Sequence, residues 1–246
     1  MEKEQMDPMD LQLKSAAIGA VTPTDEEMAK INQYTLEDLK AEDVFTFKVV
    51  MCDNEIDRDH EVFDLSALAA MKDLFVGKTM MKDHNSRSTD GQCARIYATE
   101  LRQDEIKQTS RGEPYTQLVA HCYMLNTTEN AGIIADIKGG IKREVSVGFR
   151  AETATCSICK SDIWSCPHWW GKTYNGTVCY ATLSDVTDAY ELSFVCVPAQ
   201  PKAAVTKAKD KPREKAAEKE PDNTSDFDLR MKETESFLFA NKERND

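Results

Sequence analysis

Hydrophobic and polar residues alternate along several stretches of the chain, and each alternation predicts a β-strand with one buried face. Phe45, Phe47 and Val49 alternate with Thr46 and Lys48, which is the period-two pattern of a half-buried strand. Comparable patterns predict strands over 44–51, 78–82, 92–101, 115–124, 144–151 and 190–197. The body of the protein is therefore expected to be rich in strands.

Helical spacing predicts two helices between these strands. Asp64 is a suitable N-cap for a helix through Phe75 that places Leu68 and Met71 on one face, and Gly77 is expected to end it. A second helix, capped by one of the two threonines at 127 and 128, carries isoleucines at 133, 134, 137 and 141.

The composition divides the chain into a central domain and polar ends. Residues 1–40 form an acidic arm with a helical stretch near 24–33, and the domain follows over 41–205. A charged linker is expected over 206–225 and an amphipathic helix over 226–246, which docks either on a partner or on the protein's own body.

Length and charge exclude several classes of protein. The chain has 246 residues, which suits one domain, and a formal net charge of −12, which argues against a dedicated nucleic-acid binder. No apolar run has the roughly 18 residues of a membrane span. The polar N-terminus does not resemble a secretory signal, so we expect a reducing cytosol.

Four of the eight cysteines lie close together in the sequence and indicate a metal site. Cys156, Cys159, Cys166 and His168 offer a Cys₃His set for a structural zinc ion, with Cys179 as the reserve ligand. Such a closed site would cross-link and stabilise a cysteine-rich insertion over residues 152–181. The alternatives to a metal site are a redox pair or unpaired thiols in a tryptophan-rich loop. As a further functional alternative, residues Cys156–Cys179 would be the binding element of a zinc-ribbon adaptor.

A serine within one predicted strand is a candidate nucleophile. Ser146 and Gly148 fall on the face opposite Val145 and Val147, so Ser146 is expected to point away from the apolar stripe. Gly148 would leave the neighbouring surface bare, so that a substrate backbone can approach the hydroxyl.

A nucleophilic serine needs a base and a group that orients the base. Of the four histidines, His168 is assigned to the metal, His60 lies in an acidic turn and His121 lies in an apolar strand. His84, at a strand end, is the best candidate. Glu191 begins another alternating strand and is the candidate orienting carboxylate.

The order of four segments along the chain adds a family resemblance. These segments are Asn54–Asp59 with Glu61–Phe63, Gly77–Lys78 leading to Asp83–His84, Glu144–Phe149, and Glu191–Val195 with Pro198–Pro201. Together, over roughly residues 34–205, they resemble the tailed-phage prohead (head maturation) serine proteases. That family is similar in fold to the herpesvirus assemblin proteases.

The resemblance implies a fold and a catalytic set. The fold would be α+β, a compact β-barrel surrounded by helices, and the serine and histidine would come from the segments that match Ser146 and His84. The herpesvirus enzymes use a second histidine as third member. Because no histidine follows His168, an acidic residue is implied instead: Glu191, with Glu144 and Asp188 as fallbacks. The family pattern does not require the cysteine cluster.

The resemblance also implies a function. It predicts a serine endopeptidase, active in the host cytoplasm inside the immature prohead, that cleaves scaffolding protein or the scaffold-like part of the major capsid protein, and its own flexible ends. Direct nucleic-acid or membrane binding is not expected, and a homo-oligomer stays open. The alternative is a non-enzymatic scaffold or capsid-assembly protein with the same fold and zinc staple.

Overall fold

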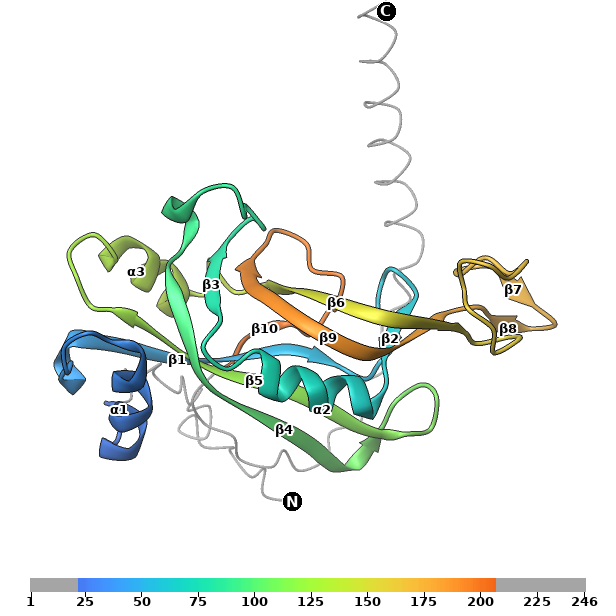
Figure 1. The fold of residues 1–246 in the computed structure, drawn as a ribbon, viewed down its shortest axis with the longest axis horizontal. Helices are drawn as coiled ribbons and strands as arrows, with labels where there is room; N and C mark the ends of the chain where they lie inside the picture. The colour runs from blue at the N-terminus through green and yellow to red at the C-terminus, as the bar shows by residue number, and fades with distance from the viewer. Residues whose placement is uncertain (1–21, 207–246) are drawn as a thin grey trace, which may run out of the picture. The chain divides into compact units, whose positions relative to one another are not determined.

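The computed structural model describes residues 22–206, which form a strand-rich α+β structure (Figure 1). The larger sheet contains β1 (Val44–Asp53), β2 (Glu61–Phe63), β3 (Thr79–Lys82), β4 (Ala94–Gln108), β5 (Pro114–Leu125), β6 (Val145–Cys156), β9 (Ala181–Phe194) and β10 (Ala204–Thr206), and a separate pair contains β7 (Thr173–Tyr174) and β8 (Thr177–Val178). The α-helices are α1 (Asp25–Ile31), α2 (Leu65–Leu74) and α3 (Ala131–Gly139), and the 3₁₀ turns are η2 (Asn32–Tyr34), η3 (Ala41–Asp43) and η4 (Thr89–Gly91).

The larger sheet is mixed and open. Its strands follow the order β10-β1-β5-β4-β3-β9-β2, and β6 pairs with β9 outside this path. Strand β9 runs parallel to β2 and β3 but antiparallel to β6. The expected α+β class is therefore confirmed. The expected barrel surrounded by helices is not shown, because the strand order has two ends and the described residues form few helices.

Helix α2 begins and ends where the sequence predicted. The Asp64 side chain accepts a hydrogen bond from the Ala67 N–H, as an N-cap does. Phe75 follows the helix and is fully buried, and Gly77 then adopts a φ of +83°. Since this left-handed conformation disfavours residues with a Cβ, glycine suits the turn into β3.

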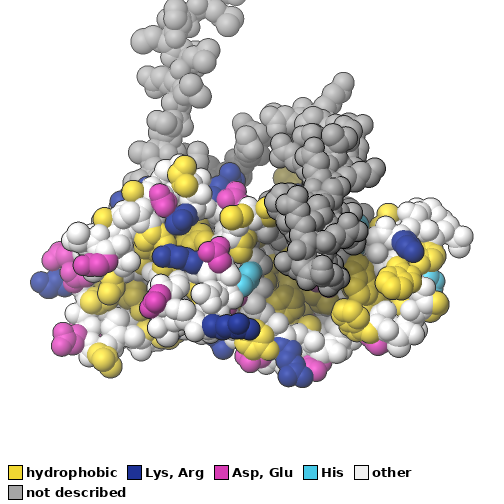
Figure 2. Space-filling view, turned by 90° about the horizontal axis from the view of Figure 1, so that it is seen from above, with side chains coloured by type: hydrophobic (Ala, Val, Ile, Leu, Met, Phe, Trp, Pro, Cys, Tyr) yellow, Lys and Arg dark blue, Asp and Glu magenta, His cyan; other side chains and the backbone are white. Residues whose placement is uncertain are grey.

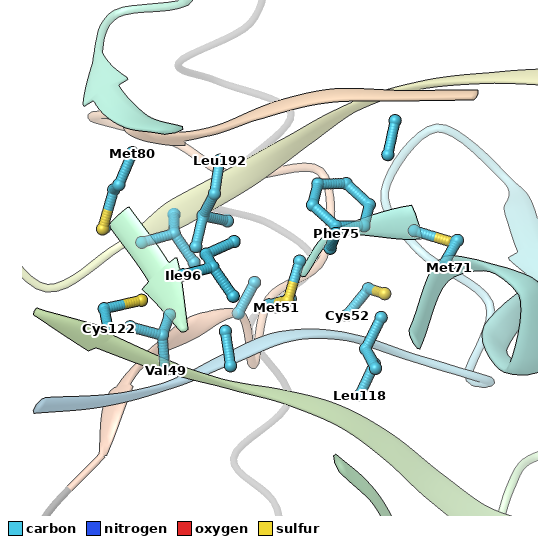
Figure 3. Packing of buried hydrophobic residues seen from close by; sticks show 14 of the residues in the cluster. Val49, Met51, Cys52, Met71, Phe75, Met80, Ile96, Leu118, Cys122 and Leu192 are labelled. Atoms are coloured by element: carbon cyan, nitrogen blue, oxygen red, sulfur yellow. The ribbon is translucent and has the colours of Figure 1, made fainter. Parts of the chain in front are cut away.

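The main core lies between the sheet and α2, and Figure 3 shows its packing. Phe75 and Met71 from the helix side and Met51 and Leu192 from β1 and β9 are all fully buried. Burial of each such side chain contributes about 1.5–3 kcal/mol. This packing fixes which face of β9 points to the core. The side chains on either side of Leu192 in the sequence therefore point to the other face.

Several strands extend beyond their predicted ends. The β4–β5 hairpin continues past Gln103, and β6 and β9 pair as far as Cys156 and Ala181. The extension of β4 beyond Leu101 is mostly exposed, and backbone hydrogen bonds to β5 hold it. The extension of β9 before Tyr190 instead includes the buried Leu183, Val186 and Ala189, which were not predicted as part of a strand. The short strands β2 and β10 were not predicted.

The helix α3 begins after Asn130, whose side chain makes no cap bond, rather than directly after the predicted threonine caps. Ile141 lies beyond the helix and is exposed. The predicted linker over 206–225 lies outside the described residues except for Thr206, which ends β10, and the predicted helix over 226–246 lies wholly outside them. Within 22–206, no helix has the length and apolar character needed to cross a membrane.

Candidate functional site

Ser146 lies in β6 directly opposite Ser193 of β9. Directly paired residues of an antiparallel ladder point to the same face, with Cβ atoms about 4.5–5.5 Å apart. On the other face, Val145 and Val147 pair with Phe194 and Leu192, all of which pack in or against the main core. Ser146 is therefore directed away from the core, as predicted, and it is partly exposed.

His84 lies just beyond the end of β3, beside the same part of β9. The Asp83 N–H donates to the Phe194 carbonyl at 3.0 Å, and the His84 N–H donates to Ser193 Oγ at 3.1 Å. Asp83 and His84 have φ values of +57° and +50°. This left-handed turn ends β3, and brings the imidazole back over β9.

Glu191 joins His84 on this face. Its Oε1 lies 2.7 Å from His84 Nδ1, which is the donor because an ionised carboxylate only accepts. Its Oε2 accepts a hydrogen bond from Ser193 Oγ at 2.5 Å. The glutamate is 7% exposed, whereas the His84 side chain is 41% exposed. The buried carboxylate therefore orients an imidazole that is accessible from solvent.

The other candidate acids and histidines have other partners. Glu144 pairs with Ala204, and Asp188 lies 3.7 Å from Lys78 Nζ. The remaining histidines have other contacts: His60 packs where a Gly171 Cβ would be, and His121 Nε2 lies 3.5 Å from a Glu100 oxygen. Among the candidate acids, Glu191 is thus the one in contact with His84.

The structure corrects one prediction and adds one residue. Gly148 does not leave a bare surface for a substrate, because a Cβ there would lie 2.4 Å from Glu191 Oε1. The space beside this glycine is occupied by the glutamate. Ser193 was missed, although its place two residues after Glu191 in an alternating strand puts both on one face.

A second cluster lies at the far end of the β6–β9 ladder. Ligand atoms of four residues lie within 4.8 Å of one another, a spacing that could hold a metal ion: Cys156, Cys159, Cys166 and His168. The buried His168 Nδ1 has no hydrogen-bond partner. Three thiols and one imidazole are a donor set that suits zinc.

Cys179 stands beside this group rather than in it. Its Sγ lies 3.7 Å from Cys156 Sγ, and burial raises the pKa of its thiol to about 11. Burial also raises the pKa of Cys156, but N–H donors of Cys159 and Ile158 outweigh this effect and lower it to about 7. Cys156 is therefore the more readily ionised ligand, and Cys179 is suited to donate its S–H to that sulfur.

Backbone turns and exposed aromatic residues mark this insertion. The Cys156 N–H donates to the Ser161 carbonyl at 2.8 Å, which folds the chain back after β6. Trp164 and Trp169 are 72% and 66% exposed. Figure 2 shows hydrophobic side chains gathered at the end of the molecule where Figure 1 places β7 and β8.

The two clusters are too far apart to act as one site. Ser146 and Cys156 stand ten residues apart on one strand, a separation of roughly 33 Å at about 3.3 Å per residue. A metal at the cysteine cluster therefore does not touch groups at Ser146, and its effect is on the insertion.

The remaining cysteines do not form a further cluster. Cys52 and Cys122 are buried in the main core, where burial raises the pKa of both thiols, and Cys93 packs against that core. Cys196 is exposed.

Comparison of the chain with protein-family models, with curated proteins and with solved structures gave no significant match.

Proposed function

We propose that the protein is a serine endopeptidase in which Ser146 is the nucleophile, His84 the general base and Glu191 the residue that orients the base. The observation that carries this proposal is the 2.7 Å contact between His84 Nδ1 and Glu191 Oε1, made on the same face of β6 and β9 that presents Ser146. A carboxylate on Nδ1 fixes the tautomer in which Nε2 is free to accept a proton.

The chemistry follows from this tautomer. As Ser146 Oγ attacks the carbonyl carbon of a peptide bond, its proton passes to His84 Nε2, and Glu191 stabilises the resulting imidazolium. The carbon–nitrogen bond then breaks, and the departing amine takes the proton from Nε2. Water, deprotonated by the same imidazole, hydrolyses the acyl-enzyme and restores the Ser146 hydroxyl.

The proposed biological role rests on the resemblance to prohead proteases. The substrates would be scaffolding protein or the scaffold-like part of the major capsid protein, together with this chain's own ends, inside an immature phage shell in the host cytoplasm. The closed barrel of that family is part of this proposal. It is supported by an isolated bridge between Glu144 and Ala204, which links the start of β6 to β10.

We further propose that the metal is zinc and that its role is structural. Four protein ligands close a tetrahedral site and leave no open position for a reactive water, and the unpartnered His168 Nδ1 supports such a ligand role. When bound, zinc would cross-link the turn that carries Cys156 and Cys159 to the segment that carries Cys166 and His168. The small cluster of buried apolar residues there includes Ile163 and Ala181.

The enzymatic proposal is tested with a fluorophosphonate, which forms a bond between Ser146 Oγ and phosphorus as fluoride leaves. The full chain is incubated with the probe, and the modified peptide is located by mass spectrometry. We expect labelling at Ser146 that is lost in Ser146→Ala and His84→Ala and kept in Ser184→Ala, a change to a partly buried serine of β9 that is not in the site.

The same variants, prepared without the probe, are followed by intact mass for self-cleavage. We expect the wild-type chain to shorten and the Ser146→Ala chain to stay whole. Absence of both labelling and shortening in the wild-type chain would reject the endopeptidase, and would favour the non-enzymatic scaffold or capsid-assembly protein.

A further inference from the structure

We propose that Ser193 and Gly148 are positioning residues for the His84–Glu191 pair, an inference that rests on the proposed endopeptidase function. Both residues contact Glu191, and we assign neither of them a contact with the peptide. Ser193 holds one carboxylate oxygen of Glu191 by a hydrogen bond, and Gly148 leaves the room that the other oxygen occupies.

Ser193 connects both members of the pair through one hydroxyl. The side chain is fully buried, so its hydrogen bonds do not compete with water. Its O–H donates to Glu191 Oε2 at 2.5 Å, and its oxygen accepts the His84 N–H at 3.1 Å. The hydroxyl therefore fixes the carboxylate and, at the same time, the backbone that carries the imidazole.

The backbone of His84 needs such support. Asp83 and His84 both have left-handed φ angles, a conformation that is unfavourable for residues other than glycine. Two hydrogen bonds to β9 hold the turn, one to the Phe194 carbonyl and one to Ser193 Oγ. Removal of the Ser193 hydroxyl leaves one of these bonds and loosens the base.

Gly148 matters because it has no Cβ and so leaves space for the Glu191 carboxylate, not because its backbone is flexible. It lies in β6 opposite Glu191, and its φ is not positive, so the strand itself does not require glycine. A Cβ at this position would lie 2.4 Å from Oε1 and 3.3 Å from Cδ of Glu191. Since these atoms belong to the flexible end of a side chain, an alanine would displace the carboxylate and leave the strand in place.

The two constraints act on opposite oxygens of the same carboxylate. Glutamate has three side-chain torsions, and ordering them costs conformational entropy. The hydrogen bond to Oε2 and the open space at Oε1 together select the rotamer that meets His84 Nδ1. Loss of either constraint should therefore reduce the occupancy of the His84–Glu191 hydrogen bond.

The experiment compares Ser193→Ala and Gly148→Ala with two matched controls in the full chain. Ser184→Ala removes a hydroxyl from the same strand, and Gly132→Ala adds a Cβ where no atom lies within 4 Å. The first readout is the second-order rate of fluorophosphonate labelling at Ser146, which needs no substrate.

The second readout is the nuclear magnetic resonance signal of the His84 Nδ1 proton in histidine-¹⁵N-labelled protein. It is recorded in the Ser146→Ala background, so that it does not depend on activity. The signal is assigned by its loss in His84→Gln, and protection of the proton from exchange reports the hydrogen bond to Glu191.

We expect Ser193→Ala and Gly148→Ala each to slow labelling about 10- to 100-fold, the effect of losing a hydrogen bond to a charged group. Both should also speed exchange of the Nδ1 proton, and the controls should change neither quantity. A lower unfolding temperature with unchanged labelling and exchange in both variants would overturn the inference and leave the function standing. If the wild-type chain is not labelled, the proposed function fails, whereas the exchange measurement still tests the positioning.

Discussion

The two ends of the β6–β9 ladder are organised by different forces. At the Ser146 end, β9 lies over the main core, and a buried carboxylate and hydroxyl hold an exposed imidazole. At the Cys156 end, the buried apolar cluster is small, and thiols and an imidazole converge instead. A large core can position polar groups precisely enough for chemistry, whereas a small insertion needs cross-links to be ordered.

Two irregularities in β9 separate these ends. The pairing with β6 shifts between Gly148 and Phe149 and again between Arg150 and Ala151. Each shift leaves an extra residue in β9, as in a β-bulge, which twists the strand and redirects its side chains. The first shift directly adjoins Glu191. We therefore expect the ends to respond to substitution independently, and four predictions test this comparison.

The largest effect is expected from Glu191→Gln. The amide carries no charge and cannot stabilise the imidazolium, so labelling of Ser146 by a fluorophosphonate should slow roughly 10³- to 10⁴-fold. Metal content, measured by native mass spectrometry, should not change. A labelling rate within a few-fold of the wild-type rate would contradict the assigned role of Glu191.

Truncation in the main core should come next. Leu192 is fully buried between the two site residues of β9, and Leu192→Ala should lower the free energy of unfolding by about 2–5 kcal/mol. Ile163→Ala, in the small cluster of the insertion, should instead weaken metal binding. Denaturant titration and metal competition measure the two quantities, and a large loss of global stability in Ile163→Ala would show that the insertion is part of the main core.

Removal of one metal ligand should affect only the Cys156 end of the β6–β9 ladder. Cys159→Ser deletes a thiolate, and zinc affinity should fall by more than about 100-fold. Even substitution of a residue that only hydrogen-bonds to a metal ligand lowers metal affinity by about 10- to 100-fold. Labelling of Ser146 should stay at the wild-type rate. Cys196→Ser, which alters an exposed cysteine outside the cluster, is the control. Loss of labelling in Cys159→Ser alone would show that the two ends are coupled.

The smallest effect is expected from a substitution in the middle of the β6–β9 ladder. Asp185 has a φ of +52°, and its Oδ2 accepts a hydrogen bond from Thr153 Oγ1 at 2.6 Å. Asp185→Gly relieves the left-handed strain but loses this exposed bond, so the free energy of unfolding should change by less than about 0.5 kcal/mol. Thermal unfolding measures it. A change in labelling or in zinc binding would mean that the middle of the ladder transmits effects between its ends.

The sequence by itself determined the features that depend on near neighbours. The cap at Asp64, the alternation in β1 and the face of Ser146 are set by contacts within a few residues and by the period of a strand. The convergence of Cys156, Cys159 and Cys166 was also predictable. These thiols are close in the sequence, and a short turn after Cys156 is enough to bring them together.

The tertiary structure alone decided which distant groups meet. His84 and Glu191 are 107 positions apart in the sequence, and they touch because β3 and β9 pair in parallel with Lys82 opposite Phe194. The same pairing placed Ser193 beneath His84 and filled the space at Gly148 with a carboxylate. Register between strands is set by the packing of the whole core, which no local pattern records, and so the contacts that orient the His84 imidazole became visible only in the fold.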